Sequence, residues 1–385
     1  MLQAYALRPP IQQQQIAIPD PHPEDSIPKT RVGYFVSEAY SAYEEALGQT
    51  GTAASGRALH FAADIICSGG LDIWIRGAYA YAVQHIGLAN PRIFVYLRQR
   101  ISELDKKAAS LPSTSFTLTP EVQQIICEVV LVLQLCPKRA KVSWPKVEEN
   151  TKRDGWIRGV ASAPESRAVR AVWASDTDSP TLYLVGNEFC KAVEEGAIER
   201  ALFWVRWVQE EDARLKKQMR GYGLSSKDRG SPSQSQRAKT DAGHFMAAVL
   251  LEIYRELKQK GLVRMDEEFS ELLRLWRNGE SRMAARLRKD CLGLLVLVCC
   301  EVPRWKVPAA PKLVEDPMRL SRAVSQAGQF FQEVLAYPPL PATAQITTKM
   351  LKMRLAKQKK LTEKQQKEME MDEQFDSIMD LYLRK

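Results

Sequence analysis

The chain has 385 residues, of which 45% are hydrophobic and 26% are charged. This length suits two or three domains with substantial cores, and the composition excludes a low-complexity chain. The net charge of +9 favours acidic partners, namely nucleic acid, an anionic surface or an acidic protein.

The cysteines and the chain's hydropathy indicate a cellular compartment. The seven Cys include no C-x-x-C pair and no metal-ligand spacing with the four His, and most lie in apolar runs. The N-terminus has no secretory signal, and no apolar run is long enough to span a bilayer. We therefore expect a soluble protein of a reducing intracellular compartment, with cytoplasm, nucleus, virus particle and organelle matrix all left open.

Proline and glycine divide the first part of the chain. Residues 1–30 carry six prolines and a run of four Gln, which predicts an extended arm. Periodic apolar residues then predict a helical domain over 31–147. Gly69 and Gly70 are expected to end one helix there, and Asp72 and Asn90 to cap the next two. The expected helices cover 32–47, 55–67, 72–86, 92–104 and 120–136.

The rest of the chain is expected to be helical as well, with Asn187 capping one helix and a single helix over 317–335. The tail is basic over 349–367 and acidic over 368–380, a pattern typical of a solvated, semi-ordered segment. The expected segments are a connection at 148–180, a second helical domain at 181–340 with a flexible basic linker at 218–240, and a charged helical tail at 341–385.

The two halves share one pattern. Each has an apolar helix followed by a basic stretch with Trp and Pro, at Trp144 and at Trp305. A degenerate tandem repeat of one helical unit is therefore an open possibility. The predicted fold class is all-α, with two bundle or collar-like domains, an extended N-terminal arm and a charged C-terminal helix.

Part of the first domain carries a set of spaced motifs, which are Ala58-Leu59 with Phe61, the 68–72 loop Ser-Gly-Gly-Leu-Asp, Ile75-Arg76, the 85–92 turn His-Ile-Gly-Leu-Ala-Asn-Pro-Arg, and the helix from Val129 to Pro137-Lys138. With these motifs, the region resembles the C-terminal helical domain of the RarA/MgsA family of AAA+ ATPases, which are relatives of clamp-loader subunits. His85 stands where that family has an acid, and Cys136 and Arg139 depart from its A-P-K-S ending. In that family this domain mediates oligomerisation.

No motif for catalysis accompanies the resemblance. The chain has no G-x-x-x-x-G-K-[ST] loop, H-E-x-x-H or G-x-S-x-G, and the residues before Arg57 hold no counterpart of the ATPase module. Asp176 and Asp178 are read as a surface turn rather than a metal site, and His60 and His85 as packed helix residues. We expect no enzyme activity, no cofactor, no metal and no small-molecule substrate.

Two sets of residues are candidates for partner binding. The end of the chain resembles a degenerate sliding-clamp peptide, in which a short turn presents apolar side chains to a pocket, and an ordinary amphipathic helix end is the alternative. Bases after the 120–136 helix suit its dipole, but they are also candidates for phosphate contact, as are those in the tail. The clamp-peptide residues are Met379, Tyr382 and Leu383, and the nucleic-acid candidates are Lys138, Arg139, Lys141, Lys352, Arg354, Lys357, Lys359 and Lys360.

Two functions remain open from the sequence. The favoured one is a non-enzymatic helical scaffold subunit that makes protein contacts, including self-association, in a large complex such as a virion shell or an organellar particle. The alternative is an accessory protein of DNA replication or repair that binds DNA or a sliding clamp. Insertion into a membrane is not expected.

Overall fold

A computed structural model describes residues 29–340, apart from 153–154, 220, 226, 230–238, 279–284 and 302–311. The predicted N-terminal arm up to residue 28 and the tail from 341 lie outside the described residues. The described part forms helices and two isolated β-bridges, without a β-strand. The all-α class is therefore confirmed.

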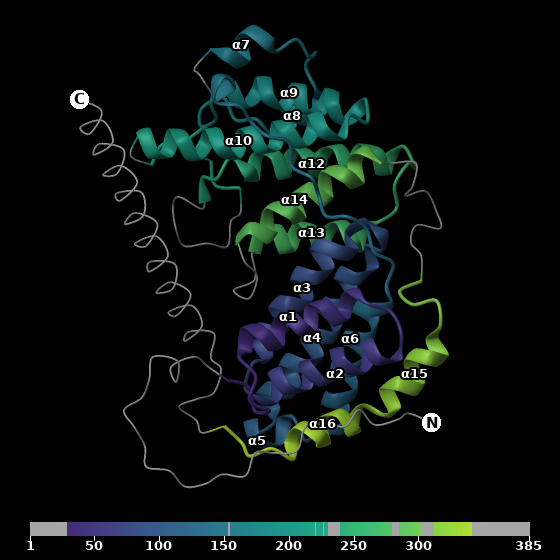
Figure 1. The fold of residues 1–385 in the computed structure, drawn as a ribbon. Helices are drawn as coiled ribbons and strands as arrows, with labels where there is room; N and C mark the ends of the chain where they lie inside the picture. The colour runs from purple at the N-terminus through teal and green to yellow at the C-terminus, as the bar shows by residue number, and fades with distance from the viewer. Residues whose placement is uncertain are drawn as a thin grey trace, which may run out of the picture.

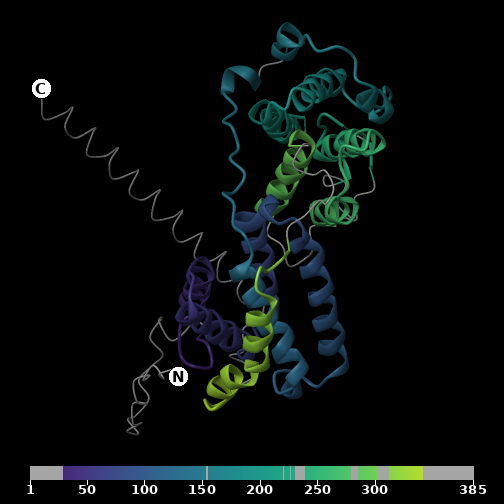
Figure 2. The same cartoon turned by 90° about the vertical axis from the view of Figure 1, so that its right-hand side faces the viewer.

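The helices form two groups placed end to end (Figures 1 and 2). The first group comprises α1 (Val36–Gly48), α2 (Thr52–Cys67), α3 (Leu71–Tyr81), the π-helix η2 (Ala82–Ile86), the 3-10 turn η3 (Gly87–Ala89), α4 (Arg92–Ser110), α5 (Ser113–Phe116) and α6 (Pro120–Leu135). The second comprises η4 (Glu149–Lys152), α7 (Trp156–Val160), α8 (Arg167–Val172), α9 (Pro180–Glu194), α10 (Ile198–Gln218), α12 (Gly243–Gln259), α13 (Asp266–Asn278) and α14 (Ala285–Cys300).

The last described helices return to the first group. Helix α16 (Ala327–Leu335) packs against α2 and α6, and α15 (Pro317–Ser325) packs against α6. The segment predicted as one helix over 317–335 is thus two helices, with Gln326 between them. Arg31 holds this return in place, because its Nε and Nη2 donate to the carbonyl oxygens of Tyr337 and Leu335 at 2.7 and 3.0 Å. Both ends of the described chain therefore meet beside α2.

Glycine sets the close approaches in the first group. Gly69 has a φ of 85°, and the N–H groups of Gly69 and Gly70 donate to Ile66 and Ile65 at the end of α2, as the sequence predicts. Gly77 on α3 faces the ring of Tyr40 on α1 with no room for a Cβ. Gly77 therefore leaves the space on α3 that the Tyr40 side chain of α1 occupies.

A strap formed by residues 137–148 joins the two groups. It has no regular secondary structure and runs along α14, where Trp144 Nε1 donates to Asp290 Oδ1 at 2.9 Å. Lys289 lies over the Trp144 ring, 4.4 Å from its centroid. A Cβ at Gly293 would come within 2.9 Å of Trp144 and Val142, so this glycine creates the space that the strap occupies.

Three predicted caps differ from the structure. Asn187 lies inside α9, where its side chain accepts a hydrogen bond from the N–H of Ser166. The side chains of Asp72 and Asn90 cap no helix, and Asn90 instead donates to the carbonyl of Lys312 at 2.9 Å. For Asn187 and Asn90, a backbone group distant in the sequence is the partner of the side chain.

Candidate functional site

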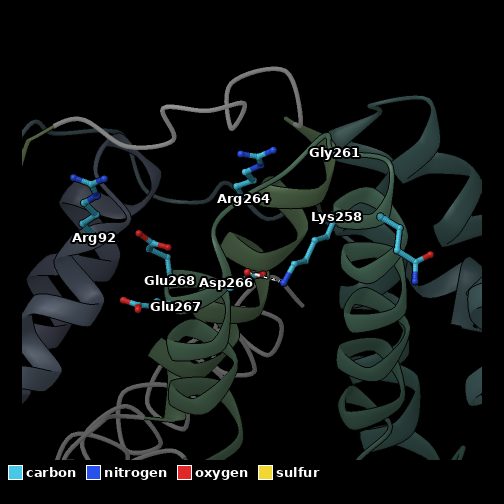
Figure 3. A pocket seen from close by; sticks show the side chains of 8 residues that line it. Arg92, Lys258, Gly261, Arg264, Asp266, Glu267 and Glu268 are labelled. Atoms are coloured by element: carbon cyan, nitrogen blue, oxygen red, sulfur yellow. Dashed lines mark hydrogen bonds and ion pairs between the residues drawn. The ribbon is translucent and has the colours of Figure 1, made fainter.

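A groove lies where the two helix groups meet (Figure 3). It has a volume of about 790 Å³ and is open to solvent. One wall is the start of α4, and the other is the turn from α12 into α13. We call it the mixed-charge groove, and its lining residues are Arg92, Lys258, Gln259, Gly261, Arg264, Asp266, Glu267 and Glu268.

Backbone geometry shapes the turn that forms the second wall. Helix α12 ends at Gln259, and Gly261 two residues later has a φ of 66°, in the left-handed region. The N–H of Gly261 donates to Lys258 at 2.9 Å, and that of Leu262 donates to Leu257 at 2.9 Å. This pairing satisfies the last carbonyl groups of α12 and sends the chain back toward α4.

Tyr254 fixes the floor of that turn. Its ring stacks on Phe269 with 4.0 Å between centroids, and its hydroxyl accepts from the N–H of Met265 and donates to Asp266 at 3.0 Å. Lys258 Nζ lies 2.7 Å from the other oxygen of Asp266. The hydrogen bond from Lys258 holds the pKa of Asp266 below its usual value. Asp266 and Lys258 therefore neutralise each other, and they belong to the wall.

The remaining charges of the groove lie unpaired among the described residues. Arg92 and Arg264 are exposed, and their guanidinium groups point the same way in Figure 3. Glu267 and Glu268 lie in the first turn of α13 and project toward α4. Carboxylates suit the N-terminus of a helix, whereas Arg92 in the first turn of α4 opposes the dipole.

A buried carboxylate joins the two walls. Glu271 on α13 is almost fully buried, and Arg98 on α4, whose side chain is 62% exposed, reaches it at 3.3 Å. Arg274, also on α13, forms a second, bidentate contact with the same carboxylate at 2.5 to 3.0 Å. Two guanidinium groups therefore share one buried carboxylate, and the contact with Arg98 links α4 to α13 beside the groove.

The sequence-predicted bases of the strap are engaged in the fold. Lys138 Nζ donates to the carbonyl groups of Leu133, Gln134 and Cys136, at the end of α6. Arg139 donates to both oxygens of Glu301 at 2.5 and 2.9 Å. These contacts account for both bases without a phosphate, and their assignment to nucleic acid stays a prediction.

The other predicted site residues are untested by the structure. Lys141 lies in the strap and is exposed. Lys352, Arg354, Lys357, Lys359 and Lys360 lie outside the described residues, as do Met379, Tyr382 and Leu383.

Two other sets of charged residues are paired within the fold. On α4, Arg100 pairs with Glu103 and Glu128 at 3.0 Å. Asp178 does not lie in a surface turn, because it is buried and forms an ion pair with Arg229. Among the described residues, no group of His, Cys, Asp and Glu has the arrangement of a metal site.

The groove has a weak signal in the sequence. Three successive acids at 266–268 follow Arg264, but Arg92 is far away in the chain, and nothing in the local pattern brings it to them. None of the described helices meets the length and hydropathy of a membrane-spanning segment. Comparison with family models, with curated proteins and with solved structures gives no match for this chain.

Proposed function

We propose that the protein is a non-enzymatic helical scaffold subunit, and that the mixed-charge groove is a contact surface for another protein of a larger assembly. The observation that carries the proposal is the lining of the groove. Its walls present charged side chains, one amide and a glycine. Pockets for small molecules are lined mainly by apolar and aromatic residues, whereas charged groups of both signs give a protein interface its specificity and register.

The contacts that hold the walls of the groove favour the same function. Glu271 links the two walls and the ring stack of Tyr254 holds the second one, so the helix ends that carry the exposed charges are in place before a partner arrives. Preorganised groups lose less conformational entropy on binding. The resemblance to the oligomerising collar domain of the RarA/MgsA family adds a second, independent argument for protein contacts.

Native mass measurement of the protein purified from its natural source tests the proposal. We expect the wild-type chain in an assembly well above its own 43.5 kDa. A double variant, Arg92→Gln with Arg264→Gln, should leave that assembly. Its fold should persist, because removing a positive charge from the first turn of α4 changes stability by about +0.3 to +1 kcal/mol.

The control removes two charges from the surface elsewhere. Arg158 on α7 and Lys106 on α4 are exposed, outside the groove, and in no ion pair with a described residue. The pair Lys106→Gln and Arg158→Gln should remain in the assembly. A wild-type protein that is a strict monomer would contradict the scaffold function, and a groove variant that assembles normally would contradict the role of the groove.

A further inference from the structure

A second surface lies at the other end of α12, about 25 Å from the mixed-charge groove by the rise of a helix of this length. It is the turn after α10, formed by Met219 and 221–223, which we call the tyrosine loop. Tyr222 N–H donates to the carbonyl of Met219 at 3.3 Å, so the turn brings the two side chains to one tip. Tyr222 is 75% exposed and Met219 52% exposed.

The stem beneath this tip is built from buried charge. Asp212 accepts hydrogen bonds from the N–H groups of Leu224 and Ala242 and from Lys216 Nζ, at 2.8, 3.3 and 2.7 Å. Lys216 also donates to the carbonyl of Thr240 at 2.8 Å. Both side chains of this ion pair are buried, so the chain is fastened on each side of the loop.

A second buried pair fastens the residues that follow. Asp178 accepts from Ser225 Oγ at 2.6 Å and pairs with Arg229, and the side chain of Asp178 is fully buried. The sequence predicts a flexible linker over 218–240, and its described residues from 221 to 229 are instead held by these contacts. Two desolvated ion pairs carry a high solvation cost, so they indicate that the position of this loop is specified.

Glycine on both sides leaves Tyr222 free to face solvent. Gly221 has a φ of 109°, which L side chains rarely adopt, and a Cβ at Gly223 would collide with the carboxylate of Asp212. The backbone therefore needs glycine before and after the tyrosine. The structure places Tyr222 on a turn that is anchored to Asp212 and, among the described residues, leaves its side chain 75% exposed.

The sequence around the loop is strongly basic. Residues 214–240 contain eight Lys or Arg and one acid, Asp228. Internal acids pair with several of these bases, whereas Lys217 and Lys227 are exposed and in no ion pair with a described residue. Single-stranded nucleic acid binds to exposed aromatic rings that are accompanied by unpaired Lys or Arg side chains, because nucleobases stack on the ring while phosphates contact the cations. A protein interface core is instead depleted in Lys.

We propose that the tyrosine loop is a binding site for single-stranded nucleic acid, with Tyr222 as the stacking platform and Lys217 and Lys227 as phosphate contacts. Sequence preference is not expected, since every base offers a flat face to the ring. The proposal goes beyond the scaffold function and uses a different surface, so either can fail without the other.

Fluorescence anisotropy of the full chain with a fluorescein-labelled oligothymidylate of about 20 nucleotides tests the site. Tyr222→Ala should weaken binding by roughly 5- to 150-fold, and Tyr222→Phe should bind as the wild type does, because the ring is kept. Lys217→Gln and Lys227→Gln should each reduce the slope of log affinity against log salt concentration by about 0.7. Met318→Ala, at another exposed apolar residue, is the control and should have no effect.

Folding does not confound the test, because Tyr222 is largely exposed and far-UV circular dichroism will report any loss of helix. No binding by the wild type at low salt would overturn the proposal. Equal affinity of Tyr222→Ala and the wild type would overturn it as well. Polyglutamate that binds as tightly, with the same loss in Tyr222→Ala, would show that the loop takes an acidic protein segment instead.

Discussion

The buried pair of Asp178 and Arg229 gives the sharpest test of how the second helix group is held. The carboxylate of Asp178 is fully buried, and the Arg229 side chain is 6% exposed. Asp178→Ala leaves the guanidinium without its charge partner, and breaking a buried pair in this way costs about 3 to 5 kcal/mol. Arg229 keeps its contacts with Ser225 Oγ at 2.9 Å and with the Phe245 ring, which places the expected loss near the lower value.

A double variant separates the lost pair from the orphaned charge. Asp178→Ala with Arg229→Met removes both charges and keeps an apolar side chain in the space. Replacing a buried ion pair by apolar groups is often neutral or stabilising. We therefore expect the double variant to recover about 2 kcal/mol or more of the stability that the single variant loses.

Urea unfolding followed by far-UV circular dichroism and tryptophan fluorescence measures both variants. The comparison rests on midpoints at equal slope, because a slope change would signal loss of two-state behaviour in a chain of this size. A single variant that costs less than about 1 kcal/mol would refute the reasoning. A double variant as unstable as the single one would show that space filling, and not the orphaned charge, sets the cost.

Three further predictions concern the first helix group and the strap. Gly70→Ala should lower the free energy of unfolding by about 1 to 3 kcal/mol, because the new Cβ would lie 2.7 Å from the carbonyl oxygen of Ile65. Gly56→Ala inside α2 places its Cβ in open space, and it should raise the free energy of unfolding by about 0.5 to 1 kcal/mol. Urea unfolding measures both variants. Gly293→Val should push the strap off α14 and raise hydrogen exchange over 141–147; unchanged exchange would mean that the strap repacks. Burial raises the pKa of Asp64, so between its ordinary 3.8 and that raised value the folded state binds more protons and stability falls as pH rises. Asp64→Asn should flatten this decline in urea midpoints measured across pH, and an unaltered profile would assign the decline to another group.

Local chemistry predicted most helices of the first group. Pro120 opens α6, and Gly69 ends α2, because proline at the first position and glycine at a left-handed position each satisfy a helix end without help from elsewhere. The all-α class and the burial of the apolar α6 and α14 followed from the same patterns. The tandem repeat of the two halves stays a prediction.

Polar side chains with distant partners defeated prediction from sequence. Asparagine is a residue type that often caps helices, but Asn187 lies inside α9, where its side-chain oxygen accepts a hydrogen bond from the N–H of Ser166. Lys138 and Arg139 form a basic pair in the sequence, and the structure places their charges on the end of α6 and on Glu301. A local sequence pattern shows which side chains can form hydrogen bonds, but tertiary packing determines which partner each one contacts.

The functional surfaces depend on the tertiary structure for the same reason. The sequence by itself determined the helices, the turn glycines and the basic charge of residues 214–240. Tertiary structure brought Arg92 to the acids of α13, and it buried Asp212 and Asp178 against the segment that follows α10. Helix signals act over one or two turns of chain, whereas a charge finds its partner across any separation that folding closes.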